Sequence, residues 1–174
     1  MDDVSATQLW NCPNGGEILE TCKYQVMATD MLAAGLDYKE RAEMLVNYVE
    51  ALVNIYPSCK AVVFEISKKM LTREDILNCT LPKEMRFIHY AVNIRFFNIQ
   101  GTNDMLVDSL GMSTLFLPDV QYHFHGLNPN DVVNHAYNVL SYIYDNDNPI
   151  EDGNTIAGIT DGNMDSDIKW KVQY

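Results

Sequence analysis

Hydrophobic and polar residues follow two periods along this chain, and the change from one to the other predicts its order of elements. Alternation with a period of two is typical of a strand with one buried face. Recurrence near 3.6 residues is typical of a helix with one buried stripe. Alternating or β-branched runs predict strands over residues 17–27, 61–66, 87–97, 120–124 and 168–174.

Two longer helices are marked by their capping residues. The first is expected over Tyr38–Ile55, with Asp37 at its start and its end before Pro57, because the residue before a proline disfavours helical backbone. The second follows Asn128 and has Pro129 at its first position. A proline is tolerated there because the N–H that it lacks would have no helical partner.

A shorter helix and several irregular segments complete the pattern. The pair Thr72 and Asp75 has the spacing of a capping box and predicts a short helix that ends near Asn78. Residues 104–117 fit neither period and are left open between helix and strand. The acidic stretches 145–149 and 161–167 are expected to be loops.

These elements together predict an α+β fold in which two main helices pack on a largely antiparallel sheet. Cleanly alternating strands have one polar face, which favours antiparallel over fully buried parallel pairing. Residues 1–16 are polar and rich in turn residues, so they are expected to form a flexible lead-in. Residues 17–174 are expected to form a single domain.

The charge balance restricts the classes of partner. The chain of 174 residues has 24 acidic against 12 basic side chains and a formal net charge of -12. Such a surface repels nucleic-acid phosphates and anionic lipid headgroups. We therefore expect no nucleic-acid or membrane partner, whereas a basic protein partner fits the charge.

The sequence has the features of a cytoplasmic protein. It has no apolar run of about 18 residues and no positively charged and apolar leader after Met1. Its cysteines have no C-x-x-C spacing and are expected to be free thiols: Cys12, Cys22, Cys59 and Cys79.

One group of histidines has the pattern of a metal site. His123 and His125 are two residues apart on an expected strand, so their imidazoles point to the same side. His89, on the polar side of another expected strand, His135 or an acidic residue would be the third ligand of zinc or iron, as in a metal-dependent hydrolase. Histidines that are merely exposed or hydrogen-bonded on a strand explain the same pattern.

A second candidate site is a clamp for small anions. Arg95 shares an expected strand face with Asn93 and His89, and a guanidinium binds carboxylate or phosphate in a bidentate manner. The protein would then be a small-anion sensor. The alternative is an internal ion pair between Arg95 and one of the many acidic residues.

The sequence motifs of the common enzyme classes are missing. There is no G-x-S-x-G elbow, no phosphate-binding glycine loop and no H-E-x-x-H helix. The acidic residues around Gly153 do not have the spacing of a calcium loop. No cofactor is expected, and a non-enzymatic interaction domain is the leading interpretation.

Four segments carry a resemblance to a known family. They are Val92–Phe97 (V-N-I-R-F-F), Asp108–Met112 (D-S-L-G-M), Leu117–Asp119 (L-P-D) and Glu151–Ile156 (E-D-G-N-T-I). In this order they resemble DUF4261, a domain of unknown function in uncharacterised bacterial proteins. The resemblance implies a soluble bacterial protein, of which this chain would be a short form or a fragment. It brings no catalytic residues, and an immunity-type binding role is an analogy only.

Overall fold

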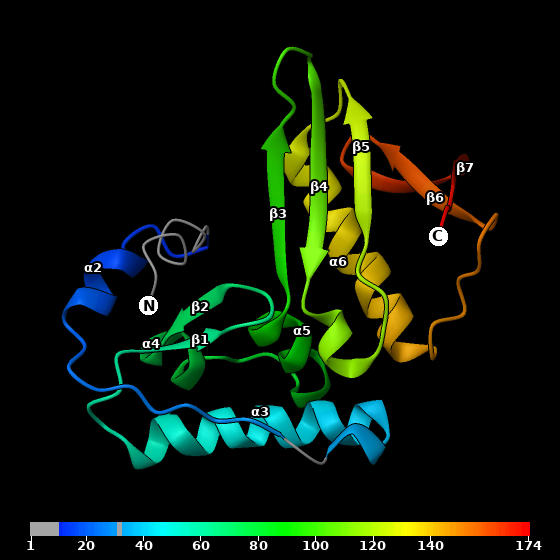
Figure 1. Ribbon diagram of the computed structural model, residues 1–174. Helices are drawn as coiled ribbons and strands as arrows, with labels where there is room; N and C mark the ends of the chain where they lie inside the picture. Colours follow the sequence, from blue (N-terminus) through cyan, green and yellow to red (C-terminus); the bar gives the residue numbers. More distant parts are fainter. Residues whose placement is uncertain (1–10, 31–32) are drawn as a thin grey trace. The chain divides into compact units, whose positions relative to one another are not determined.

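The computed structural model describes residues 11–30 and 33–174 (Figure 1). Where the sequence predicts a single domain, the chain divides into two compact units. The first unit extends to Asn93 and includes Thr114–Phe116, and the second comprises Ile94–Ser113 and Leu117–Tyr174. The lead-in expected over residues 1–16 lies largely outside the described residues, which already form a helix from Gly15 onward.

Helices and antiparallel strands alternate irregularly along the chain, as expected for an α+β protein. The helices are α2 (Gly15–Glu20), α3 (Tyr38–Ile55), α4 (Arg73–Leu77), α5 (Arg86–Ala91) and α6 (Pro129–Asp145). The strands are β1 (Ala61–Phe64), β2 (Lys69–Thr72), β3 (Asn93–Asn98), β4 (Asp104–Leu110), β5 (Gln121–His125), β6 (Thr155–Thr160) and β7 (Asn163–Lys171). Single turns of 3-10 helix lie at Ala33–Gly35, Lys83–Met85 and Met112–Leu115.

The strands do not form the one large sheet expected from the sequence. In the described residues they form a β1–β2 pair, a β3–β4–β5 sheet and a β6–β7 pair. The β1–β2, β4–β5 and β6–β7 pairs are antiparallel. No helix in the described part of the chain is long and apolar enough to cross a membrane.

The capping residues predicted from the sequence are confirmed. The Asp37 carboxylate accepts the Lys39 backbone N–H at 2.9 Å and begins α3 at Tyr38. Thr72 and Asp75 bond each other's backbone in a capping box before α4. The Asn128 side chain accepts the N–H of Asn130 at 3.0 Å at the start of α6. These local signals need no tertiary contact, which is why sequence alone reveals them.

Two predicted strands are wrong. Residues 17–27 contain α2 followed by the exposed, irregular segment 21–29, because Ile18 and Leu19 pack as helical neighbours against Cys12 and Met70. Residues 87–97 begin as helix α5 and become β3 only at Asn93. Short apolar runs do not distinguish a buried helix from a strand.

Three smaller differences concern β2, β4 and β7. Strand β2 was not predicted, because it has only four residues and begins with the charged Lys69. Residues 104–117, for which the sequence did not decide between helix and strand, form strand β4 followed by a 3-10 turn. Most of the loop expected over residues 161–167 belongs to β7, and the turn itself has Asp161 and Gly162 at positive φ.

The first unit is built around α3, which packs on α4 and α5 rather than on a sheet. Figure 1 shows α3 as the longest helix of this unit. Its buried side is continuous at helical spacing and comprises Arg41, Ala42, Val46, Val49 and Val53. Burial of such a stripe is the main source of helix stability in a folded chain.

A buried ammonium group joins the β1–β2 pair to α5. Lys69 Nζ donates to the carbonyl oxygens of His89 at 2.6 Å and Val92 at 2.8 Å. Burial lowers the pKa of Lys69 to about 8. Asn93 Nδ2 donates to the Ser67 carbonyl at 3.1 Å. Lys69 therefore satisfies two carbonyl groups at the end of α5, and Asn93 satisfies one in the turn between β1 and β2.

The second unit has its core between the β3–β4–β5 sheet and α6. Val107, Val132, Ala136 and Ile159 form the buried cluster. His135 of α6 lies beside it: its Nε2 donates to the Ala157 carbonyl at 2.7 Å, so its Nδ1 accepts the Tyr122 hydroxyl at 3.1 Å. Burial lowers the pKa of His135, against the opposing effect of the Ala157 bond.

Replacement of Gly158 by alanine should destabilise the second unit. Gly158 lies at the β6–β7 irregularity, where an added Cβ would approach Ile168 Cγ2 to 2.4 Å and Trp170 Nε1 to 2.9 Å. We expect Gly158→Ala to lower the free energy of unfolding by about 1–3 kcal/mol, measured by urea denaturation. Gly16→Ala in α2 is the control, because nothing lies within 4 Å of its added Cβ. Equal changes in the free energy of unfolding of the Gly158→Ala and Gly16→Ala variants would contradict close packing of Ile168 and Trp170 on Gly158.

The His135 network should make stability depend on pH. The folded-state pKa of His135 is lowered, so the unfolded chain binds more protons just below about pH 6.5. The contribution of neutral His135 to the free energy of unfolding is complete above that pH and is lost as the pH falls through the folded-state pKa of His135. Between about pH 7 and 5, the free energy of unfolding of wild type should therefore fall more steeply than that of His135→Gln. Equal slopes would exclude His135 as a cause.

Candidate functional site

One side of α3 faces solvent along its whole length. We define the α3 face as its exposed residues on this side: Glu40, Glu43, Met44, Asn47, Tyr48, Ala51, Asn54 and Ile55. Their spacing of three and four residues places them on one surface of the helix. Lys39, at the edge of this surface, lies over the ring of Tyr38 with its Nζ 5.7 Å from the centroid.

The distribution of charge on the α3 face is unusual for a solvent-exposed helix. Both acidic residues, Glu40 and Glu43, lie near its N-terminal end, and every later residue of the face is uncharged. Met44 is 37% exposed, Tyr48 50% and Ile55 67%. Solvent faces of amphipathic helices normally carry charged and polar residues. The α3 face thus has two glutamates at one end, with Lys39 at its edge, and an uncharged, partly apolar remainder.

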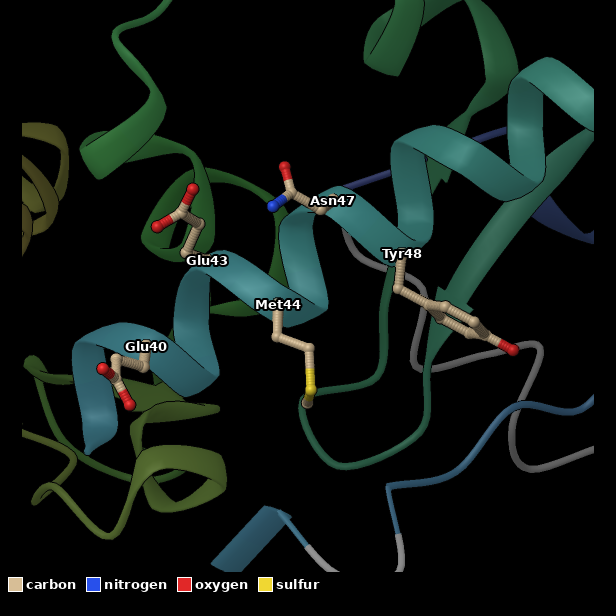
Figure 2. Close-up of a pocket in the computed structure, with 5 residues that line it drawn as sticks. All are labelled: Glu40, Glu43, Met44, Asn47 and Tyr48. Carbon is tan, nitrogen blue, oxygen red and sulfur yellow. The ribbon is translucent and has the colours of Figure 1, made fainter. Parts of the chain in front are cut away.

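The acidic end borders a shallow hollow. The described residues that line it all come from α3: Glu40, Glu43, Met44, Asn47 and Tyr48. Figure 2 shows these side chains on successive turns of the helix. A small ligand is normally enclosed on most of its surface, which one side of one helix cannot provide. The surface is better suited to contact with another macromolecule.

The edge of the α3 face is fixed by a polar network around Glu50, which lies seven residues, or about two helical turns, after Glu43. Glu50 Oε1 accepts Arg86 Nη1 at 2.7 Å and the Tyr90 hydroxyl at 3.2 Å. Burial is the largest cause that raises the pKa of Tyr90, so the phenol remains a donor. Arg86 Nε also donates to the Leu81 carbonyl at 2.8 Å. These bonds hold α3 against α5 and keep the α3 face turned outward.

Glu43 has a weak ion pair at the edge of the face. Its Oε1 lies 3.5 Å from Lys83 Nζ, and both side chains are more than half exposed. Ion pairs of this kind contribute little to stability because solvent screens them. Glu43 can therefore exchange Lys83 for a cationic group of a partner at small cost.

The structure brings His123 and His125 together around a carboxylate. His123 Nε2 lies 3.1 Å from Asp104 Oδ2, and His125 Nδ1 lies 3.1 Å from Asp104 Oδ1. Asp104 of β4 is the register partner of His125 of β5. Both imidazoles are mainly exposed on the β4–β5 pair. The sequence placed the two histidines correctly but did not indicate Asp104.

His89 does not share this sheet. It lies in α5 of the first unit, where its backbone carbonyl accepts Lys69 Nζ. His135, the other possible third ligand, is buried and bonded to Tyr122 and Ala157. Within residues 11–30 and 33–174, no group of three or more His, Cys, Asp or Glu side chains is arranged to hold a metal ion.

Arg95 and Asn93 have partners within the protein. Arg95 Nε and Nη2 donate to the two oxygens of Asp108, at 2.9 Å and 2.5 Å respectively. This bidentate pair joins β3 to β4, with the guanidinium 5.2 Å from the ring centroid of Phe97. Asn93 is buried and donates to the Ser67 carbonyl. An external anion at Arg95 would have to displace a carboxylate that is already bound in the best geometry.

Asp119 organises the turn after β4. Its carboxylate accepts the Ser109 hydroxyl at 2.8 Å and the backbone N–H groups of Gly111 at 3.3 Å and Met112 at 3.2 Å. Ser109 Oγ in turn accepts the Val120 N–H at 2.9 Å. The segments D-S-L-G-M and L-P-D therefore bind each other and hold a turn.

Sequence reasoning did not identify the α3 face. It used the buried stripe of this helix to predict the helix and left the opposite side unexamined. The available signal was the uncharged character of Met44, Asn47, Tyr48, Ala51 and Ile55 on the expected solvent side. Charged residues would be expected at such positions.

The fold and the site define an α+β protein with an exposed helix face that carries two glutamates at one end and is uncharged and partly apolar beyond them. Residues 108–174 match the model of a family described as Domain of unknown function (DUF4261). The resemblance stated from the sequence is confirmed over this part of the chain, which includes three of the four segments; Val92–Phe97 precedes it. No curated protein and no solved structure gives a significant match.

Removal of the Asp119 carboxylate should destabilise the matched region. Asp119→Ala leaves the Ser109 hydroxyl and two backbone N–H groups without their acceptor. We expect the free energy of unfolding to fall by at least about 2 kcal/mol, measured by urea denaturation. The control is Asp152→Ala near the chain end, which removes an acceptor of the Tyr174 N–H and should change stability by about 0.5 kcal/mol or less. Similar losses in both would contradict a special role of Asp119.

Proposed function

We propose that this chain is a non-enzymatic interaction domain that binds a basic protein partner through the α3 face. The observation that carries the proposal is the uncharged, partly apolar run from Met44 to Ile55 on a solvent-exposed helix surface, preceded by Glu40 and Glu43. Contiguous exposed apolar residues bordered by polar ones are typical of contact sites between proteins.

The net charge supports the same partner class. A formal charge of -12 attracts cationic proteins over distances beyond contact and raises their association rate. Glu40 and Glu43 would then pair with basic side chains at one end of the face. Apolar contacts at Met44 and Tyr48 would exclude water and slow dissociation.

The polar groups of the second unit support binding over catalysis. Arg95 is paired with Asp108, and the imidazoles of His123 and His125 contact Asp104. A metal-dependent hydrolase or an anion sensor would have to break these contacts first. An immunity-type role, in which the bound partner is a toxin, is one form of the proposed binding function and rests on analogy alone.

The double variant Glu40→Lys/Glu43→Lys should weaken partner binding. The partner would be recovered by affinity purification of the wild-type chain from its own cells, purified, and titrated calorimetrically against each variant. We expect the dissociation constant to rise about tenfold or more, because the variant places two cations opposite the basic groups of the partner.

A matched control distinguishes a local contact from a general effect of charge. Glu17→Lys/Glu20→Lys makes the same charge change at the same spacing on α2, where both residues are exposed. It should change the dissociation constant by less than about twofold. An equal effect of both double variants would rule out the α3 face as the specific site. Recovery of nothing but background proteins under several growth conditions would rule out the interaction function.

A further inference from the structure

We infer that the partner element recognised by the α3 face is an amphipathic helix, basic at one end and uncharged along the side that contacts Met44, Tyr48 and Ile55. The inference rests on the proposed function and names the partner's chemistry at the same surface. It follows from the shape of the face, its hydrogen-bonding capacity and the position of its charges.

The shape of the α3 face is that of a straight stripe. Glu40, Met44, Tyr48 and Ile55 mark a surface of 15 residue steps, or roughly 22 Å at 1.5 Å per residue. Side chains at intervals of three and four residues form ridges that fit the grooves of a second helix. The five side chains labelled in Figure 2 show such an arrangement over the first half of the stripe.

The backbone of α3 excludes the main alternative for a bound peptide. An extended segment binds best when it adds to the open edge of a sheet, because its main chain then gains hydrogen bonds. In the interior of a helix the N–H and C=O groups already bond each other. An extended peptide would gain little there, whereas an amphipathic helix satisfies its own backbone and buries an apolar side.

The two carboxylates of the face are both at one end, with Lys39 at the edge of the surface beside them, and they set the orientation of the complex. Glu40 and Glu43 lie in the first two turns, and the later residues of the face are uncharged. The basic residues of the partner helix must therefore lie over these turns. Its apolar residues must lie over Tyr48 and Ile55, which are half exposed or more.

A second copy of this chain is a poorer occupant. Two α3 faces in parallel would place the same carboxylates opposite each other. In antiparallel orientation, Glu40 and Glu43 of each copy would lie over the apolar end of the other, where Glu40 gains no cation and Glu43 keeps only its own 3.5 Å ion pair with Lys83. Unpaired charges at an interface are costly. A basic helix avoids both problems.

The expected complex is weak. A stripe roughly 22 Å long and 10 Å wide is much smaller than the 800 Å² or so that each partner buries in a standard interface. We therefore expect a dissociation constant in the micromolar range, strongly dependent on salt through Glu40 and Glu43.

The experiment begins with a photo-crosslinking amino acid at Asn47, in the middle of the face, expressed in the cells that make this protein. Mass spectrometry identifies the cross-linked segment, which is then synthesised as a peptide. We expect a basic amphipathic helix by sequence, helical when bound by circular dichroism. A cross-linker at Glu17 of α2 is the control position and should not capture this segment.

Exchange of charge between the two glutamates of α3 and the basic end of the peptide tests the orientation of the bound helix. Glu40→Lys/Glu43→Lys should weaken binding of the peptide about tenfold or more and remove most of its salt dependence. A peptide whose two end basic residues are changed to glutamate should bind this variant better than wild type. Tyr48→Ala should weaken binding to a similar degree while the salt dependence remains. Thermal unfolding of each variant checks that the fold is retained.

Each result is decisive for one of the two proposals. Capture of a second copy of the chain, of an extended or non-basic segment, or a failure of charge exchange would overturn the basic-helix inference and leave the interaction function standing. Capture of the partner at Glu17 but not at Asn47 would overturn the choice of the α3 face. Absence of any captured protein at both positions would overturn the interaction function itself.

Discussion

The first unit depends on how a single buried ammonium group satisfies the end of a helix. At the end of α5, Lys69 Nζ donates to the carbonyl oxygens of His89 and Val92, and the bond to Val92 is buried. Without these bonds the unsatisfied carbonyls would each cost about 1–3 kcal/mol. The same lysine lies within β2, so one side chain fixes the β1–β2 pair and α5 relative to each other. Helix α3 packs on the α5 surface that results.

Sequence reasoning succeeded where a structural signal is local. Asp37, Thr72 and Asn128 each bond backbone within a few residues; the helices that follow them were predicted, the two longer ones with the correct first residue. It failed where tertiary contacts decide. All of residues 87–91 except His89 are buried, and burial on more than one side favours helix α5 over the strand that the sequence predicts. Strand β2 begins with Lys69, a charged residue that does not indicate a buried strand. Its ammonium group is buried because it bonds the carbonyl of His89 in α5, which the sequence does not show.

The candidate sites show the same division. The sequence identified Arg95, Asn93, His123 and His125 as polar residues of interest. Their partners Asp108, Asp104 and the Ser67 carbonyl come from other elements and could not be deduced from spacing. The segments that resemble the family make structural contacts and likewise do not indicate a reaction. Asp119 links the segments Asp108–Met112 and Leu117–Asp119 in a turn. In the segment Glu151–Ile156, the Gly153 N–H donates to the Val172 carbonyl. They specify the fold of the matched region and give no chemistry.

The α3 face is separate from the residues that hold the protein together. The core contacts of this helix come from Ala42, Val46, Val49 and Val53 and its polar anchor from Glu50, whereas Met44, Asn47 and Tyr48 face solvent. Substitutions at exposed positions outside special contacts usually change stability by about 0.5 kcal/mol or less. The outer side of α3 is thus free to vary in evolution at almost no cost to folding. Chains that share this architecture can diverge in what they recognise while their cores remain the same.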